Sequence, residues 1–99
     1  MKNNEDHFKI LRKIQKKPDF TQRELAEELG FSLGKLNYCL IALKSKGLIK
    51  IENFKKSSNK MSYIYSLTSK GISLRIKLTI SFMKKKMIEY DELKKEIEN

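Results

Sequence analysis

The 99-residue sequence predicts a mainly α-helical fold that contains one small β-hairpin. Apolar residues recur at helical spacing in several segments, and capping residues, glycines and the single proline separate these segments. Between residues 48 and 67, apolar and polar residues alternate instead with the period of two that is typical of strands. The length suits one domain with one modest hydrophobic core.

The first helix is expected over residues 4–17, where Phe8, Leu11 and Ile14 form one apolar stripe. Pro18 should end this helix, because the residue before a proline is disfavoured in helical geometry. The chain then has only a short connection before the next set of helix signals.

The second helix should begin at Thr21, whose hydroxyl can cap the N-terminus while Glu24 completes a capping box. Phe20 and Leu25 occupy the positions of a hydrophobic staple on either side of the cap. Gly30 is expected to end the helix, because glycine readily adopts the left-handed conformation needed there. A tight turn should therefore join this helix to the next, as in a helix-turn-helix.

The third helix is expected over residues 32–46, with Ser32 as its N-cap and Gly47 just after its end. At helical spacing, its inner face is apolar and consists of Leu33, Leu36, Leu40 and Leu43, with Cys39 at the margin. Its outer face consists of Gly34, Lys35, Tyr38, Ile41 and Ser45, with Asn37 on the flank. Such a short, polar, basic and aromatic face suits a nucleic-acid groove better than bulk solvent.

Two strands should form the hairpin, Leu48–Phe54 and Met61–Leu67. Residues 55–60 between them hold three lysines and no apolar side chain, so we expect a basic, mobile loop at the tip of the hairpin. A helix-turn-helix followed by such a hairpin is a winged helix-turn-helix, and the hairpin is its wing.

Thr68 should cap a final helix over residues 69–98. Residues 72–82 alternate at strand spacing, but no turn residue follows Gly71 and residues 83–97 recover helical spacing, so we expect one long helix. A monomer of this size cannot cover a helix that is apolar on most sides, which predicts a homodimer. The predicted dimer contacts are Ile72, Ile76, Ile80, Met83, Met87, Tyr90, Leu93 and Ile97.

The charge distribution indicates a polyanionic partner. The formal net charge is +10, and residues 29–88 hold thirteen Lys and Arg against one acid, Glu52. Together with a winged helix-turn-helix, this charge points to double-stranded DNA. We therefore expect a DNA-binding domain over 1–67 and a dimerisation helix over 68–99, within one compact unit. The predicted DNA contacts are Thr21, Gln22, Arg23, Ser32, Lys35, Asn37, Tyr38, Lys55, Lys56, Ser58, Asn59 and Lys60.

No other chemistry is indicated by the sequence. The chain has no Gly-rich phosphate loop and no nucleophile motif, so we expect no enzymatic activity. His7 and Cys39 are each the only residue of their type, which predicts no disulfide, metal or other cofactor and favours Cys39 as a core residue. The N-terminus lacks an apolar signal segment and no stretch is apolar enough to span a membrane, so we expect a cytoplasmic protein.

Two other functions fit parts of the sequence. A winged helix can serve as a protein–protein interaction module, recruited here through the long C-terminal helix. Residues 72–88, which are apolar and basic, could instead lie on an anionic membrane surface. Their lysines are scattered around the helix rather than segregated on one face, which favours the other functions over membrane attachment.

Five stretches carry a resemblance to a known family: Gln22–Ala26, Ser32–Leu40, Asn53–Phe54, Asn59–Lys60 and Leu67–Ile72. With similar spacing elsewhere, residues 5–98 resemble the MarR-type winged-helix transcription regulators, and more closely a subgroup of small proteins associated with exopolysaccharide gene clusters. The resemblance implies a bacterial homodimer that regulates transcription, with exopolysaccharide genes as its targets. Larger MarR-type proteins have further helices that enclose an effector pocket, and this chain lacks that length, so we expect no effector ligand.

Overall fold

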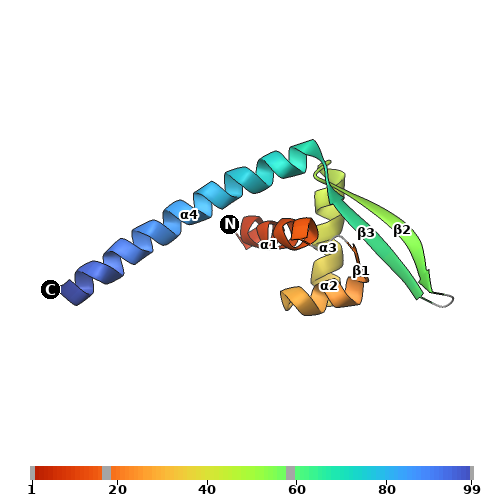
Figure 1. Ribbon diagram of the computed structural model, residues 1–99, viewed down its shortest axis with the longest axis horizontal. Helices are drawn as coiled ribbons and strands as arrows, with labels where there is room; N and C mark the ends of the chain where they lie inside the picture. Colours follow the sequence, from red (N-terminus) through yellow and green to blue (C-terminus); the bar gives the residue numbers. More distant parts are fainter. Residues whose placement is uncertain (1, 17–18, 58–59, 99) are drawn as a thin grey trace.

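The computed structural model describes residues 2–16, 19–57 and 60–98, and it describes the side chains of 5–16, 20–52 and 63–98 (Figure 1). Its elements in chain order are α1 (Lys2–Lys16), β1 (Asp19–Phe20), α2 (Gln22–Leu29), α3 (Leu33–Ser45), β2 (Ile49–Ser57), β3 (Lys60–Leu67) and α4 (Ser69–Glu98). The predicted fold class, a mainly helical chain with a winged helix-turn-helix and a long C-terminal helix, is confirmed. The first helix begins at Lys2, two residues before the predicted start.

The turn between α2 and α3 is built from the predicted capping residues. The Thr21 hydroxyl accepts a hydrogen bond from the Glu24 N–H at 3.0 Å, and the Glu24 carboxylate accepts one from the Thr21 N–H at 2.8 Å. Gly30 ends α2 with a φ of 72°, a left-handed conformation that side chains disfavour. Ser32 then accepts a hydrogen bond from the Lys35 N–H at 3.1 Å and starts α3.

The sheet contains a short strand that the sequence analysis did not predict. Among the described residues the strand order is β1-β3-β2, with β1 and β2 both antiparallel to β3. Because β1 consists of Asp19–Phe20 only, it is too short to show the alternation by which a strand is recognised in sequence. Its pairing with Tyr63 and Ile64 ties the connection before α2 to the middle of β3.

The hairpin strands are longer than predicted, so the prediction of a six-residue basic loop at 55–60 was wrong. Strand β2 continues to Ser57 and β3 begins at Lys60, with an irregularity in the register between Lys55 and Ser57. Lys55 and Lys56 therefore belong to β2. A ladder of backbone hydrogen bonds does not require apolar side chains, so the loss of alternation after Phe54 did not mark the end of the strand.

The core lies between the helices and the sheet, and its buried apolar residues are Ile10, Leu11, Ile14, Phe20, Leu25, Ala26, Leu36, Cys39, Leu40, Leu43, Leu48, Ile49 and Tyr65. Cys39 is thus a core residue, as predicted. Leu33 was expected on the inner face of α3 but is 44% exposed, because the first turn of the helix extends past the core. Burial raises the pKa of the Tyr65 phenol, and neighbouring Tyr63 adds to the effect.

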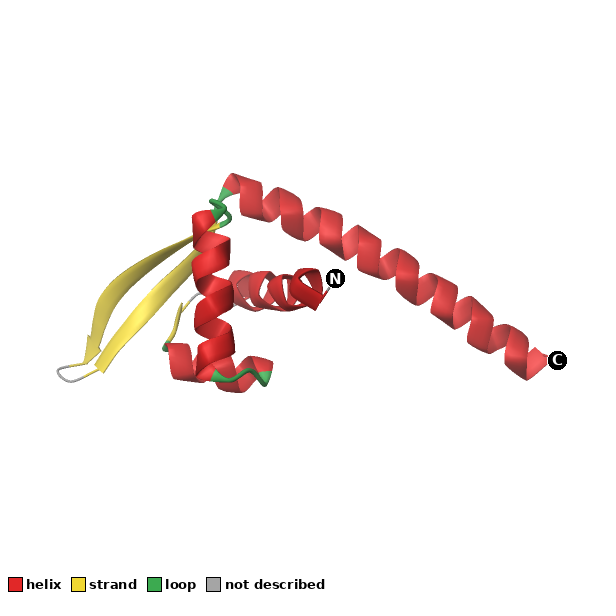
Figure 2. Cartoon of the chain, turned by 180° about the vertical axis from the view of Figure 1, so that it is seen from behind, coloured by secondary structure: helices red, strands yellow, loops and turns green. Residues whose placement is uncertain are grey.

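Helix α4 leaves the rest of the molecule at a close backbone contact. The Thr68 hydroxyl donates a hydrogen bond to the Gly47 carbonyl at 2.6 Å and accepts one from the Gly71 N–H at 3.0 Å. Gly71 packs on the backbone of Leu48, where a Cβ atom would overlap the Leu48 carbonyl oxygen. From this joint α4 runs past α1 and extends away from the body (Figures 1 and 2). The strand-like alternation of residues 72–82 therefore lies on a helix, as predicted.

Candidate nucleic-acid interface

Helix α3 presents a face that the rest of the chain leaves open. Tyr38 is 68% exposed and Ile41 is 60% exposed, and Gly34, Asn37 and Ser45 are exposed beside them. Leu36, Leu40 and Leu43 on the other side of the helix are buried in the core and hold this face outward. The helix therefore offers an amide, a phenol and an aliphatic side chain together, which can contact base edges and the thymine methyl group.

The positions of the elements around α3 determine what can bind to its exposed face. Figure 2 shows α2 at one end of α3, and the hairpin and α4 leaving from the other end in different directions. Lys44 and Lys46 are exposed near this second end, and Lys50 is exposed where β2 begins. The hairpin thus starts next to the C-terminal end of α3, where a wing can reach a polyanion that contacts the helix.

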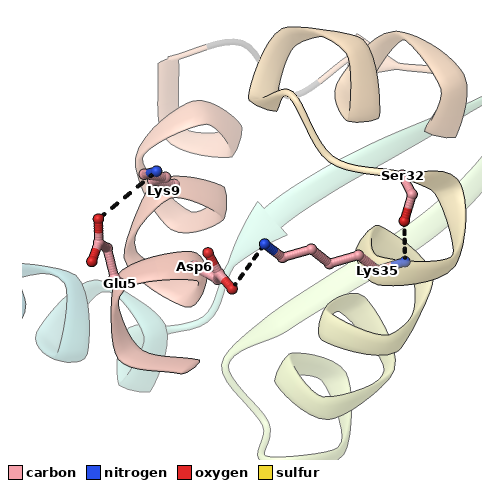
Figure 3. A network of polar contacts seen from close by, with 5 residues as sticks. All are labelled: Glu5, Asp6, Lys9, Ser32 and Lys35. Carbon is pink, nitrogen blue, oxygen red and sulfur yellow. Dashed lines mark hydrogen bonds and ion pairs between the residues drawn. The ribbon is translucent and has the colours of Figure 1, made fainter. Parts of the chain in front are cut away.

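One side chain of the predicted interface is held by the first helix. Figure 3 shows Lys35 reaching from α3 to Asp6 on α1, with a distance of 3.3 Å between its amino group and the carboxylate. The same amino group lies 4.3 Å from the centre of the Phe31 ring. The Asp6 side chain is 19% exposed and that of Lys35 is 47% exposed. Lys35 is therefore already ion-paired before any DNA binds.

A second ion pair next to this contact stays within α1. Glu5 and Lys9 lie one helical turn apart, and their charged groups are 3.9 Å from each other (Figure 3). Both side chains are at least half exposed. The two neighbouring carboxylates thus differ, because only Asp6 ties α1 to the helix that is expected to contact DNA.

A buried histidine follows Asp6 directly on α1. His7 is 5% exposed, and burial lowers its pKa, with the positive charge of Lys46 acting in the same direction and Asp6 opposing it. Cys39 on α3 has its pKa raised by burial and by Asp6, against a smaller effect of Lys35. Both groups are therefore neutral near pH 7, which suits a packed interface and not a reactive site.

The other predicted contacts lie on two elements beside α3. Thr21 and Gln22 are half-buried and Arg23 is exposed, all at the start of α2. Lys55 and Lys56 are in β2 and Lys60 is the first residue of β3, so their backbone places them at the far end of the hairpin. The predictions for Ser58 and Asn59 lie outside the described residues. The fold gives the positions of these residues and does not test whether they contact DNA.

Sequence reasoning missed Asp6 and Phe31 as partners of Lys35. Asp6 is 29 positions from Lys35 in the sequence, so no local spacing could indicate the contact. Within the described part of the chain, no group of three or more His, Cys, Asp or Glu residues could hold a metal ion. Nor does any helix there have the length and apolar content that a membrane crossing requires.

Comparison with known proteins supports the winged-helix interpretation. Residues 4–50 match the family model described as winged helix-turn-helix DNA-binding, which covers just under half of the chain. This match agrees with the prediction of a DNA-binding protein that is not an enzyme. No curated protein matches the chain.

Solved structures of MarR-type proteins share the fold. A Staphylococcus aureus MarR in complex with salicylate and kanamycin is 24% identical, with a TM-score of 0.66 over 87% of this chain and 56% of that one. A mutant of S. aureus MepR is 19% identical, with a TM-score of 0.72 over 88% of this chain and 64% of that one. An E. coli MarR mutant complexed with operator DNA is 26% identical, with a TM-score of 0.62 over 73% of this chain and 50% of that one.

The chain spans between half and two thirds of the length of these three structures. The sequence identities are low, between 19% and 26%. These structures therefore establish a common fold without establishing a common ligand or target. Residues 4–50 thus match a winged helix-turn-helix DNA-binding model, and the chain has the fold of MarR-type proteins.

Proposed function

We propose that the protein is a sequence-specific regulator of transcription that binds double-stranded DNA as a homodimer in the cytoplasm. Helix α3 enters the major groove, and the hairpin lies on the phosphate backbone or in the adjacent minor groove. The observation that carries the proposal is the outward face of α3, where Asn37 and Tyr38 are exposed on a helix whose other side is fixed in the core. Asparagine can pair with adenine through two hydrogen bonds, and a tyrosine hydroxyl can reach a base edge or a phosphate.

The charge of the chain supports DNA as the partner. Residues 29–88, which include α3, the hairpin and the first two thirds of α4, hold thirteen Lys and Arg and one acid. Phosphate contacts supply most of the affinity for DNA and need no particular base sequence, so Lys55, Lys56 and Lys60 on the hairpin are proposed to grip the backbone. The α3 face is proposed to supply the sequence preference.

The dimer in this proposal is motivated by the exposed apolar residues of α4. Ile76 is 48% exposed, Met83 57%, Tyr90 65% and Ile97 86%, and these residues follow one another at intervals of seven. In water such a stripe favours association with another apolar helix. Because a two-fold dimer presents two copies of α3, the preferred site should be an inverted repeat with its half-sites about one helical turn apart.

The experiment that tests this function is selection of binding sites from random DNA duplexes by the purified full chain. The proposal expects an enriched inverted repeat and an affinity that falls steeply with salt, as phosphate contacts require. Recovery of single asymmetric sites would contradict the dimeric mode of binding. Absence of any enriched sequence would contradict sequence-specific binding altogether.

A second candidate is a protein–protein interaction module, which the same exposed stripe of α4 favours. In that case the selection would return no preferred sequence, while the exposed apolar stripe of α4 would bind another protein.

The resemblance of Ser32–Leu40 to a small exopolysaccharide-associated subgroup extends the first proposal to exopolysaccharide genes. A change in the transcripts of such genes when this protein is removed would test that extension. No metal or effector ligand is part of the proposal.

A further inference from the structure

A small pocket lies at the joint where α3, the start of β2 and α4 meet, and the proposed function does not use it. Its volume is about 350 Å³, and the described residues that line it are Lys46, Leu48, Lys70, Ser73, Leu74 and Lys77. Leu48 is buried and Leu74 is half-buried, so they form an apolar floor. The lysines are all exposed. Half of these lining residues are thus positively charged, and none is acidic.

One lysine of this pocket is fixed at the end of α3. Lys46 is the C-cap of α3, and the Lys70 amino group donates a hydrogen bond to the Lys46 carbonyl oxygen at 3.1 Å. The C-terminal end of a helix carries a partial negative charge, which repels phosphate. Lys70 places a positive charge there and still has further N–H groups to donate. The end of α3 can therefore accept an anion that a bare helix end would repel.

The charges of the pocket lysines are not neutralised by acids of the described chain. The lysines that form ion pairs there are Lys9, Lys13, Lys35 and Lys86. Lys46, Lys70 and Lys77 are not among them, and Glu52 is the single acid between residues 29 and 88. Like charges around one pocket raise its positive potential and attract a polyanion.

The pocket lies beside the open face of α3. Lys46 follows Lys35 by eleven residues, about three helical turns, so both lie on the same flank of that face. At the start of α3 this flank is neutralised, because Asp6 holds Lys35. At the end of α3 the flank is free to bind an anion. Side chains beside a helix in the major groove can reach the phosphates that border the groove.

The pocket and the exposed apolar stripe lie on different sides of α4. At helical spacing Lys70, Leu74 and Lys77 share one side of the helix, turned away from Ile76 and Met83. A dimer formed through the apolar stripe would therefore leave the pocket open. An occupant of the pocket does not compete with the proposed association of two chains.

We propose that Lys46, Lys70 and Lys77 bind the phosphate backbone of the DNA next to the groove that α3 enters, and that the apolar floor of the pocket packs against the carbon atoms of a deoxyribose. Figure 2 shows the hairpin and α4 leaving this end of α3 in different directions, so the pocket and the hairpin hold the backbone at separate points. The contact adds affinity without sequence preference. This inference rests on the proposed function and assigns the first turns of α4 a direct part in DNA binding.

The test compares Lys77→Ala with Lys84→Ala in the full chain, using a DNA duplex of mixed sequence across a salt series. Lys84 follows Lys77 by seven residues on the same side of α4, but it lies about 10 Å further along and does not line the pocket. We expect Lys77→Ala to weaken binding about fivefold near 0.1 M salt and to lower the log K against log salt slope by about one unit. Lys84→Ala should change binding by less than about twofold. Lys77→Arg keeps the charge and should retain most of the affinity.

A hairpin variant measured in parallel separates this inference from the proposed function. If Lys60→Ala lowers the salt slope and Lys77→Ala does not, the chain binds DNA without the pocket and the inference is overturned alone. A chain that binds no duplex would overturn both. Equal losses for Lys77→Ala and Lys84→Ala would also overturn the inference, because they would reflect the total charge of α4 and not a contact in the pocket. Thermal melting checks that each variant is folded.

Discussion

The winged part of the molecule and α4 differ in whether their apolar residues are buried. From α1 to β3 they are packed together, and within the described residues every fully buried large side chain lies between Ile10 and Tyr65. In α4, Gly71 is the buried residue among those described, and the large apolar side chains from Ile72 to Ile97 are exposed or half-exposed. The winged part thus has a core of its own, whereas α4 leaves its apolar side chains exposed. In the proposed dimer, the winged part would therefore supply the stability of the fold and α4 the association.

The change with the largest expected effect is the removal of residues 84–99. The truncated chain should keep its core and lose self-association, because the deletion removes half of the exposed stripe and leaves the winged part whole. Affinity for a site with two half-sites should then fall by about 100-fold or more, since the gain from bivalent binding is lost. Affinity for a single half-site should change little. A truncated protein that is still dimeric by light scattering would show that the end of α4 is not needed for association.

The joint between the two regions should be the next most sensitive position. Gly71→Ala places a Cβ atom against the Leu48 carbonyl oxygen, so the backbone has to move, and we expect a loss of roughly 1–3 kcal/mol in the free energy of unfolding. Gly34→Ala is the matched control, because no atom lies within 4 Å of its Cβ position. Alanine is favoured over glycine in a helix, so this variant should gain up to about 1 kcal/mol. Urea denaturation measures both, and changes of the same sign would refute the proposed close contact.

We expect the Asp6–Lys35 ion pair to stabilise the packing of α1 on α3 and, at the same time, to weaken DNA binding. Asp6→Asn releases Lys35 for phosphate, so we expect tighter DNA binding and a log K against log salt slope that is steeper by about one unit. The expected loss of stability is about 0.5–1 kcal/mol, as for other partly exposed pairs. Glu5→Gln removes the same charge from the neighbouring position without releasing Lys35. If the two variants bind DNA equally, Lys35 has no role that depends on Asp6.

The smallest effect is expected from pH. Burial holds the pKa of His7 below the ordinary value of 6.5, so the unfolded chain binds this proton more readily than the folded one. Stability should therefore fall as the pH drops below 6.5 and continue to fall until the folded form is also protonated. His7→Gln should flatten this part of the pH profile of the melting temperature. An unchanged profile would mean that protonation of His7 is not coupled to folding.

Local signals in the sequence predicted most of the fold correctly. The Thr21–Glu24 capping box, Gly30 and Ser32 act within a few residues of themselves, so their effects could be inferred without knowledge of the tertiary structure. The long helix after Thr68 was also recovered, because the absence of turn residues outweighed its strand-like alternation.

The features that were missed depend on contacts between distant segments. Strand β1 exists through its pairing with β3, and the burial of His7 depends on how α1 packs on the rest of the chain. The extension of the hairpin beyond Phe54 depends on a backbone ladder that leaves no pattern in lysine-rich sequence. The pairing of Lys35 with Asp6 likewise joins two helices that are far apart along the chain.

The central claim, that α3 reads DNA sequence while the hairpin grips the backbone, is tested most directly by comparing two kinds of variant across a salt series. Asn37→Ala and Tyr38→Ala should each lose about 1–3 kcal/mol on the selected site and lose discrimination at particular bases. Lys60→Ala should weaken binding to selected and scrambled duplexes alike and lower the log K against log salt slope by about one unit. If the Asn37 and Tyr38 variants keep full sequence preference, α3 does not read the DNA and the account is contradicted.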